Sequence, residues 1–173
     1  MGGFTQYELP VKGLHAGIHS YEFLLDKAFF KNFPDTPVVE SNIQVKLDLD
    51  KRPEMLILDI KLEGHVETDC DRCLAPIRLP INGRHQLLVK LKLNAEGEED
   101  PDVVFVDPEI DRFGVAEYLY EYTVLAVPIK KVLDCENMEP KPCDLDTLKR
   151  MENKQIQGDH PFVDALKNWS VNN

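Results

Sequence analysis

The 173-residue sequence has no apolar stretch that approaches the roughly 18 consecutive residues needed by a membrane-spanning helix. Its first residues lack the basic and apolar regions of a secretory signal peptide, so we expect a soluble, cytoplasmic protein. Hydrophobic residues make up 43% and charged residues 29%, which excludes a wholly disordered or fibrous chain. A phosphate-binding glycine loop, a G-x-S-x-G turn and an H-E-x-x-H helix are all missing. We therefore expect a protein that is not an enzyme.

Charge is plentiful but unevenly distributed. Twenty lysines and arginines against 31 acidic residues give a net charge of −11, which argues against a protein that binds naked phosphate backbone, and we expect no DNA partner. Residues 94–111 contain eight acidic residues and no basic one, whereas residues 72–93 contain five basic residues and no acidic one. These five are Arg72, Arg78, Arg84, Lys90 and Lys92.

The basic and acidic segments each have two interpretations. Several cations close together can contact RNA phosphates, although cations on the solvent side of a strand often only discourage edge pairing. The acidic segment is either a solvated loop or a docking surface for a basic partner such as a ribosomal protein. The five basic residues are therefore candidate RNA-binding residues.

Alternation of apolar and polar side chains predicts most of the strands. It is strict over residues 43–50, resumes from residue 56 towards Cys70, and recurs over residues 87–93. Residues 18–26 and 102–106 are also strand-like, and residues 28–30 suggest a short aromatic helix. Pro76 and Pro80 are expected to interrupt the chain, because proline cannot donate to a central strand ladder.

After Asp111 the apolar residues recur every three or four positions until Pro128, which predicts a helix with Asp111 as its N-cap. Further helices are predicted around residues 145–151 and over residues 159–169. Because strands come first and helices last, we predict an α+β fold with an antiparallel, β-rich sheet or partial barrel. We place a core domain at residues 1–128 and a polar, partly helical segment at residues 129–173, packed on the core or partly mobile.

Four cysteines form the sharpest local pattern. Cys70 and Cys73 stand in a C-x-x-C arrangement, which suits two thiolate ligands of one tetrahedral zinc ion. The other two ligands would be Cys135 and Cys143, which are more widely spaced than is usual. A redox pair and four ordinary thiols are the alternative interpretations.

Several motifs resemble those of the YceD family, the large ribosomal RNA subunit accumulation proteins. They begin with Gly13-Leu14, Gly17 and the run from His19 to Phe23, followed by Phe29-Phe30. The strand 58–64 then leads into Cys70-Asp71-Arg72-Cys73-Leu74, and the segment 159–166 is similar to the closing family pattern.

The resemblance implies a non-enzymatic factor in biogenesis of the large ribosomal subunit, with a β-rich domain and, in members with two cysteine pairs, zinc binding. We hypothesise that the chain supports accumulation of large-subunit rRNA by binding precursor RNA, a basic ribosomal protein, or both. The alternative is a zinc-stabilised protein-interaction module with indirect effects on RNA. A thiol oxidoreductase is a third hypothesis, from the C-x-x-C pattern alone.

Overall fold

The computed structural model describes residues 4–38, 40–92, 103–135 and 138–156, with side chains as far as residue 151. The chain divides into two compact units. The sheet unit comprises residues 1–68 and 78–131, and the cysteine unit comprises residues 69–77 and 132–173. The predicted boundary at residue 128 stays a prediction.

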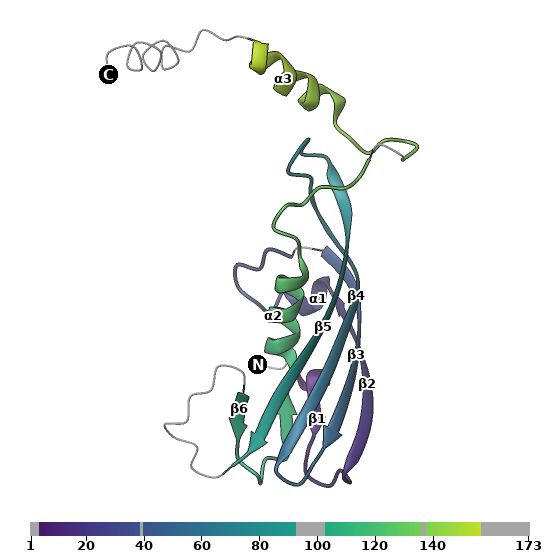
Figure 1. Cartoon of the computed structure of the whole chain (residues 1–173). Coiled ribbons are helices and arrows are strands. Elements are labelled where there is room, and N and C mark those ends of the chain that lie inside the picture. Colours follow the sequence, from purple (N-terminus) through teal and green to yellow (C-terminus); the bar gives the residue numbers. More distant parts are fainter. Residues whose placement is uncertain (1–3, 39, 93–102, 136–137, 157–173) are drawn as a thin grey trace, which may run out of the picture. The chain divides into compact units, whose positions relative to one another are not determined.

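The described elements confirm an α+β fold with a largely antiparallel sheet (Figure 1). In chain order they are η1 (Thr5–Tyr7), β1 (Glu8–Pro10), β2 (Gly17–Asp26), α1 (Lys27–Phe30), β3 (Glu40–Lys51), β4 (Met55–Asp69), β5 (Pro76–Leu91), β6 (Val103–Val106), β7 (Arg112–Gly114), α2 (Ala116–Ala126) and α3 (Leu145–Ile156).

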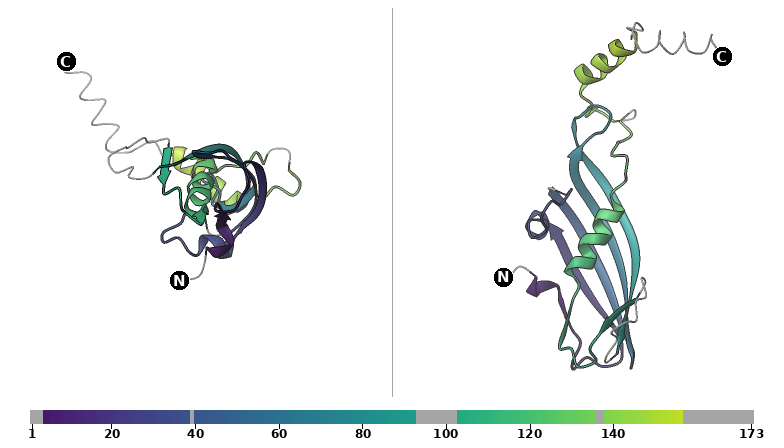
Figure 2. Two further views of the ribbon diagram at one scale, coloured as in Figure 1. Left: turned by 90° about the horizontal axis from the view of Figure 1, so that it is seen from below. Right: turned by 90° about the vertical axis from the view of Figure 1, so that its left-hand side faces the viewer.

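The main sheet has the strand order β2-β3-β4-β5-β6. β2 pairs antiparallel with β3, and β3 with β4, whereas β6 runs parallel to β5 over Leu88–Leu91. β1 and β7 form a separate antiparallel pair. The sheet curves around α2, which lies along its inner face (Figure 2).

The core of the sheet unit is built from the alternating residues that predicted the strands. Ile43, Val45, Leu47 and Leu49 of β3 are all at most 1% exposed, and every second residue of β4 from Leu56 to Leu62 is buried against the same side. Burial of each such side chain stabilises the fold by about 1.5–3 kcal/mol. The opposite side chains of both strands face solvent, so only one face of the sheet is covered.

An aromatic cluster joins the N-terminal elements to α2. The rings of Phe33 and Tyr120 stack with their centroids 4.0 Å apart, and Tyr7 meets Phe29 edge-on at 4.8 Å. α1 is fixed nearby because the Asp26 carboxylate accepts hydrogen bonds from the amides of Ala28 and Phe29. These contacts anchor η1, α1 and α2 to each other.

Two details of the prediction are wrong. The prolines do not interrupt β5, which continues from Pro76 to Leu91. Pro76 is the first residue of β5. Pro80 comes before Leu88–Leu91, the stretch of β5 that pairs with β6. Neither proline therefore needs to donate a backbone hydrogen bond to β6.

The helix expected from Asp111 begins later, at Ala116, after Val115 as its N-cap. Asp111 instead precedes β7, and its carbonyl oxygen accepts hydrogen bonds from the amides of Val11 and Lys12. The three-residue strand therefore replaces the first turn that the spacing suggested. The predicted helix over residues 159–169 lies outside the described residues.

Candidate functional site

Strand β5 places most of the predicted RNA-binding residues on one face. Side chains point alternately to the two sides of this strand, and one side faces the core. Arg78, Arg84 and Lys90 all point to the other side and are exposed. Lys92 follows the strand at the same parity, and it is exposed as well. The structure therefore aligns four of the five predicted cations.

The surroundings of these four cations are mixed in charge. Arg78 forms an ion pair with Glu67, with 3.2 Å between nitrogen and oxygen. The Lys90 ammonium lies 5.7 Å from the centre of the Phe105 ring, within the range of a cation–π contact. An ion pair on an exposed surface contributes little stability, and it leaves the arginine able to exchange its partner for a phosphate.

Arg84 lies in a shallow depression with two cations that are not among the five predicted ones. Lys46 and Lys61 line it with Arg84, as do Asp48 and Asp59. The antiparallel register sets Lys46 opposite Lys61 and Asp48 opposite Asp59. The alternation over residues 43–50 and from residue 56 is compatible with more than one register, so the sequence did not indicate which of these charges lie opposite each other.

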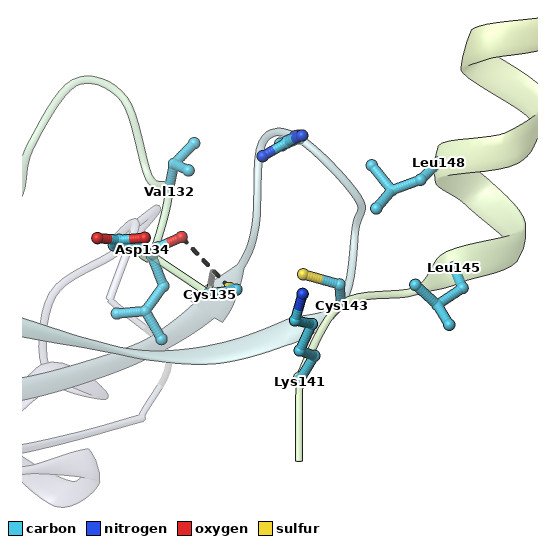
Figure 3. A pocket seen from close by; sticks show the side chains of 9 residues that line it. Val132, Asp134, Cys135, Lys141, Cys143, Leu145 and Leu148 are labelled. Atoms are coloured by element: carbon cyan, nitrogen blue, oxygen red, sulfur yellow. Dashed lines mark hydrogen bonds between the residues drawn. The ribbon is translucent and has the colours of Figure 1, made fainter. Parts of the chain in front are cut away.

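Arg72, the fifth predicted cation, belongs to the cysteine unit and is exposed. Together with Lys141 it lines a hollow of about 510 Å³ in this unit. The other walls include Cys135, Cys143 and the first turn of α3, as Figure 3 shows. Arg72 thus lies near the cysteines and belongs to a different unit from Arg78, Arg84 and Lys90.

The C-x-x-C segment forms a tight loop between β4 and β5. The Cys70 amide donates to the carbonyl oxygen of Ala75 at 2.9 Å, and the Leu74 amide donates to that of Cys70 at 2.8 Å. Leu74 adopts a left-handed conformation with φ of 59°. Cys70 and Cys73 are only 2% and 1% exposed, which withholds both sulfurs from the solvent that a thiol-exchange reaction requires.

Cys135 and Cys143 belong to the same unit as the C-x-x-C loop. The Cys135 thiol donates to the carbonyl oxygen of Leu133 at 3.3 Å. Its pKa is raised above the ordinary value by burial, by a hydrogen bond with Cys143, and by the nearby charges of the other three cysteines when they ionise. The two segments lie side by side, since Arg72 of the C-x-x-C loop lines one hollow with Cys135 and Cys143.

Four thiols provide the right number and kind of donors for a tetrahedral zinc ion. Nevertheless, the side chains of the described residues do not form a group of three or more donors already arranged to hold a metal. The donor chemistry fits zinc, and binding would require the thiols to turn towards one centre.

A raised thiol pKa has the opposite effect to the activation of a redox cysteine, which needs a lowered one. Burial of Cys135 is the largest cause, and repulsion between thiols adds to it, because each ionised sulfur hinders ionisation of the next. A divalent ion would remove that repulsion.

Five of the eight acidic residues of the acidic segment lie outside the described residues. Its last members, Asp107, Glu109 and Asp111, are described and exposed. Lys12 lies 3.8 Å from the Glu109 carboxylate and 3.6 Å from that of Asp111, so this end of the segment attracts a cation within the chain itself.

Comparison with known proteins gives one match. A family model described as "Large ribosomal RNA subunit accumulation protein YceD" matches residues 58–168, which include both the cations of β5 and all four cysteines. The comparisons with curated proteins and with solved structures found no match. Among the described residues, the helices are too short or too polar to cross a membrane.

Proposed function

The chain belongs to the YceD family of large ribosomal RNA subunit accumulation proteins, and we propose that it acts as a cytoplasmic, non-enzymatic factor in biogenesis of the large ribosomal subunit. In this role it binds precursor RNA, a basic ribosomal protein, or both. The family match over residues 58–168 is the observation that carries the proposal.

The cations of β5 support a direct contact with the particle. Arg78, Arg84 and Lys90 share one exposed face, and Lys46 and Lys61 extend it across two neighbouring strands. Carboxylates lie between these cations, so the face suits a few phosphate contacts and not a long backbone track. A binding site of this kind favours particles that also offer protein contacts, since the net charge of −11 repels free RNA.

Charge reversal on this face tests the RNA contact. We expect Arg84→Glu/Lys90→Glu to sediment less with immature large subunits than the wild type. Its association should also depend less steeply on salt, by about one unit of slope for each lost phosphate contact. The measurement is sedimentation of tagged protein from gently lysed cells across a salt series, with identification of the co-migrating RNA.

The matched control is Lys12→Glu/Lys130→Glu, which makes the same change in net charge on exposed residues away from this face. If the control loses as much particle association as the β5 variant, net charge and not the β5 face governs binding. If both variants migrate as the wild type does, the contact does not use these cations.

The cysteine unit favours a second candidate, a zinc-stabilised protein-interaction module. Its four thiols come from two segments more than 60 residues apart, Cys70/Cys73 and Cys135/Cys143. Zinc bound by them would tie these segments together and release thiol protons on binding. The exposed apolar side chains of Leu74, Leu145 and Met151 would then be held in fixed positions for a protein partner.

Zinc content and amide exchange test this module. We expect the purified wild type to hold about one zinc ion per chain, and Cys143→Ser to lose it with faster amide exchange in residues 132–135 and 138–151. Leu145→Ser, a nearby change that removes no donor, is the control and should retain the metal. A metal-free wild type with slow exchange in these residues would contradict the proposal.

A further inference from the structure

β2 is an edge strand of unusual openness. It forms one end of the main sheet, and within the described part of the chain it pairs with a strand on one side only. Its ten residues keep an unbroken antiparallel register with β3, from Gly17 opposite Lys51 to Asp26 opposite Asn42. The strand therefore presents a regular row of backbone groups on its other side, although the Leu24 carbonyl oxygen already accepts a hydrogen bond from the Tyr7 hydroxyl.

Several of the usual means of blocking such an edge are absent from β2. Natural edge strands are protected by proline, lysine, a bulge or short length. Residues 17–26 contain no proline and no lysine, the register shows no bulge, and ten residues exceed the mean strand length. By this criterion the strand is built to accept a further strand.

Apolar side chains on both faces of β2 are left incompletely covered. Ile18 is 72% exposed and Leu24 is 51% exposed on the solvent face. Tyr21 and Phe23 point to the core side yet remain half-buried, although Phe23 lies 5.5 Å from the Tyr7 ring. An added strand would cover such side chains from the edge, because cross-strand neighbours lie on the same face.

The charge near this edge is negative. β2 carries two carboxylates, Glu22 and Asp26, and no lysine or arginine. On the adjoining strand, Asp48 and Asp50 lie opposite Ser20 and Ile18. Two cations partly balance these carboxylates: Lys46 lies 3.8 Å from the Glu22 carboxylate, and Arg52 lies 2.9 Å from that of Asp50. A strand rich in lysine or arginine would thus be attracted, whereas an RNA backbone would be repelled.

We propose that the β2 edge binds an extended, lysine- or arginine-rich segment of a partner protein by strand addition. Backbone hydrogen bonds to the edge would supply affinity, alternate apolar side chains of the segment would cover Tyr21 and Phe23, and its cations would lie on the opposite, solvent face with Glu22 and Asp26. This inference rests on the proposed function, for which it specifies the chemistry of the protein partner.

A designed peptide tests the strand addition directly. The probe is a labelled peptide of alternating valine and lysine, compared with the same peptide N-methylated at alternate backbone nitrogens. Methylation keeps the charge but removes hydrogen-bond donors along one edge. By fluorescence anisotropy with the full chain, we expect the methylated peptide to bind at least about tenfold more weakly. Amide exchange over residues 17–26 should slow only with the unmethylated peptide.

Variants of the protein provide the second arm. Ile18→Lys should weaken peptide binding about tenfold, because lysine on an edge strand opposes pairing and repels the probe. Leu125→Lys is the matched control, since Leu125 is likewise 72% exposed but lies on α2, and it should bind as the wild type does. Equal losses in the two variants, or equal affinity for the two peptides, would reduce the interaction to net charge and overturn the proposal.

Two further results separate this inference from the proposed function. If Ile18→Lys loses peptide binding but still sediments with immature subunits as the wild type does, the edge is not the route to the particle; the inference fails and the proposed function stands. Slow exchange over residues 17–26 that appears without peptide and increases with protein concentration would assign the edge to a second copy, which also overturns it.

Discussion

At the scale of single residues, His85 combines good packing with an unmet polar requirement. Its ring stacks on Tyr122 with centroids 4.3 Å apart and an interplanar angle of 1°. Its Nε2 atom is buried and has no hydrogen-bond partner among the described residues. Burial lowers the pKa of His85 from its ordinary value of 6.5, because the charged imidazolium loses its water.

The depressed pKa of His85 predicts a stability that falls in mild acid. As the pH decreases through 6.5, the unfolded chain takes up a proton at this residue before the folded chain does. The contribution of neutral His85 to the free energy of unfolding is therefore complete above pH 6.5 and decreases below it. It levels off below the pKa of the folded state. Urea unfolding from about pH 5 to about pH 8 measures this. The free energy of unfolding of His85→Phe should change less with pH than that of the wild type.

His15→Phe provides the comparison, because it removes an exposed histidine and leaves the stacked one in place. An unchanged slope in His85→Phe, or an equal change in His15→Phe, would mean that the acid sensitivity arises elsewhere. Neither the stacking nor the unmet Nε2 was predictable from sequence, since both depend on how α2 meets β5.

At the scale of elements, the β3–β4 hairpin depends on a close backbone approach at Gly64. This glycine lies opposite Ile43 in the register. A methyl group added to it would lie 2.6 Å from the Ile43 Cα and nearer still to the Asn42 carbonyl oxygen. Because both atoms belong to the backbone, the clash cannot be relieved by a side-chain rotation.

We expect Gly64→Ala to lower the free energy of unfolding by about 1–3 kcal/mol, the usual range for overpacking. Gly114→Ala is the matched control, since a methyl group there would have no neighbour within 4 Å, and its stability should stay close to that of the wild type. Urea unfolding of the two variants measures the difference. A stable Gly64→Ala would show that the two strands can move apart without penalty.

The elements that sequence predicted well are those with a strict period. The solvent-facing and buried residues of β3 and β4 follow the alternation residue by residue. β7 was missed because three residues are too few to show a period, and it is held by pairing with β1, a contact between residues more than 100 positions apart. β5 was shortened by Pro80 because sequence alone does not reveal which side of a strand is open.

At the scale of the whole molecule, the two units differ in how well their residues are covered. β3 and β4 contain many side chains that are at most 2% exposed. The described side chains of residues 132–151, in contrast, are all half-buried or exposed. The candidate cysteine site therefore has little apolar burial to hold it, apart from Cys70, Cys73 and their neighbours in the loop.

This difference predicts two classes of amide exchange in the full chain. Amides of β3 and β4 should exchange only through global unfolding, whereas those of residues 132–135 and 138–151 should exchange through local opening at much lower free energy. Hydrogen exchange with mass spectrometry, with and without added zinc, measures both classes. Slowing by zinc confined to the cysteine unit would support the metal site, and slow exchange in both units without zinc would contradict the predicted difference.

The predictability of the candidate sites also differed by scale. Cys70 and Cys73 could be paired from their spacing, but the proximity of Cys135 required the chain to return to the loop from beyond α2. Alternation was enough to predict that Arg78, Arg84 and Lys90 are exposed on one side of β5. That Asp48 and Asp59 lie between the cations was not predictable, because it depends on the register of the strands.

The aromatic cluster has a practical consequence for spectroscopy. Tyr120 is stacked on Phe33, and Tyr7 contacts both Phe23 and Phe29, all within the sheet unit. Tyrosines held in such asymmetric surroundings give near-ultraviolet circular dichroism, which disappears when fixed packing is lost. The chain thus carries a built-in optical reporter of its sheet unit, one that needs no label and follows loss of packing even where secondary structure survives.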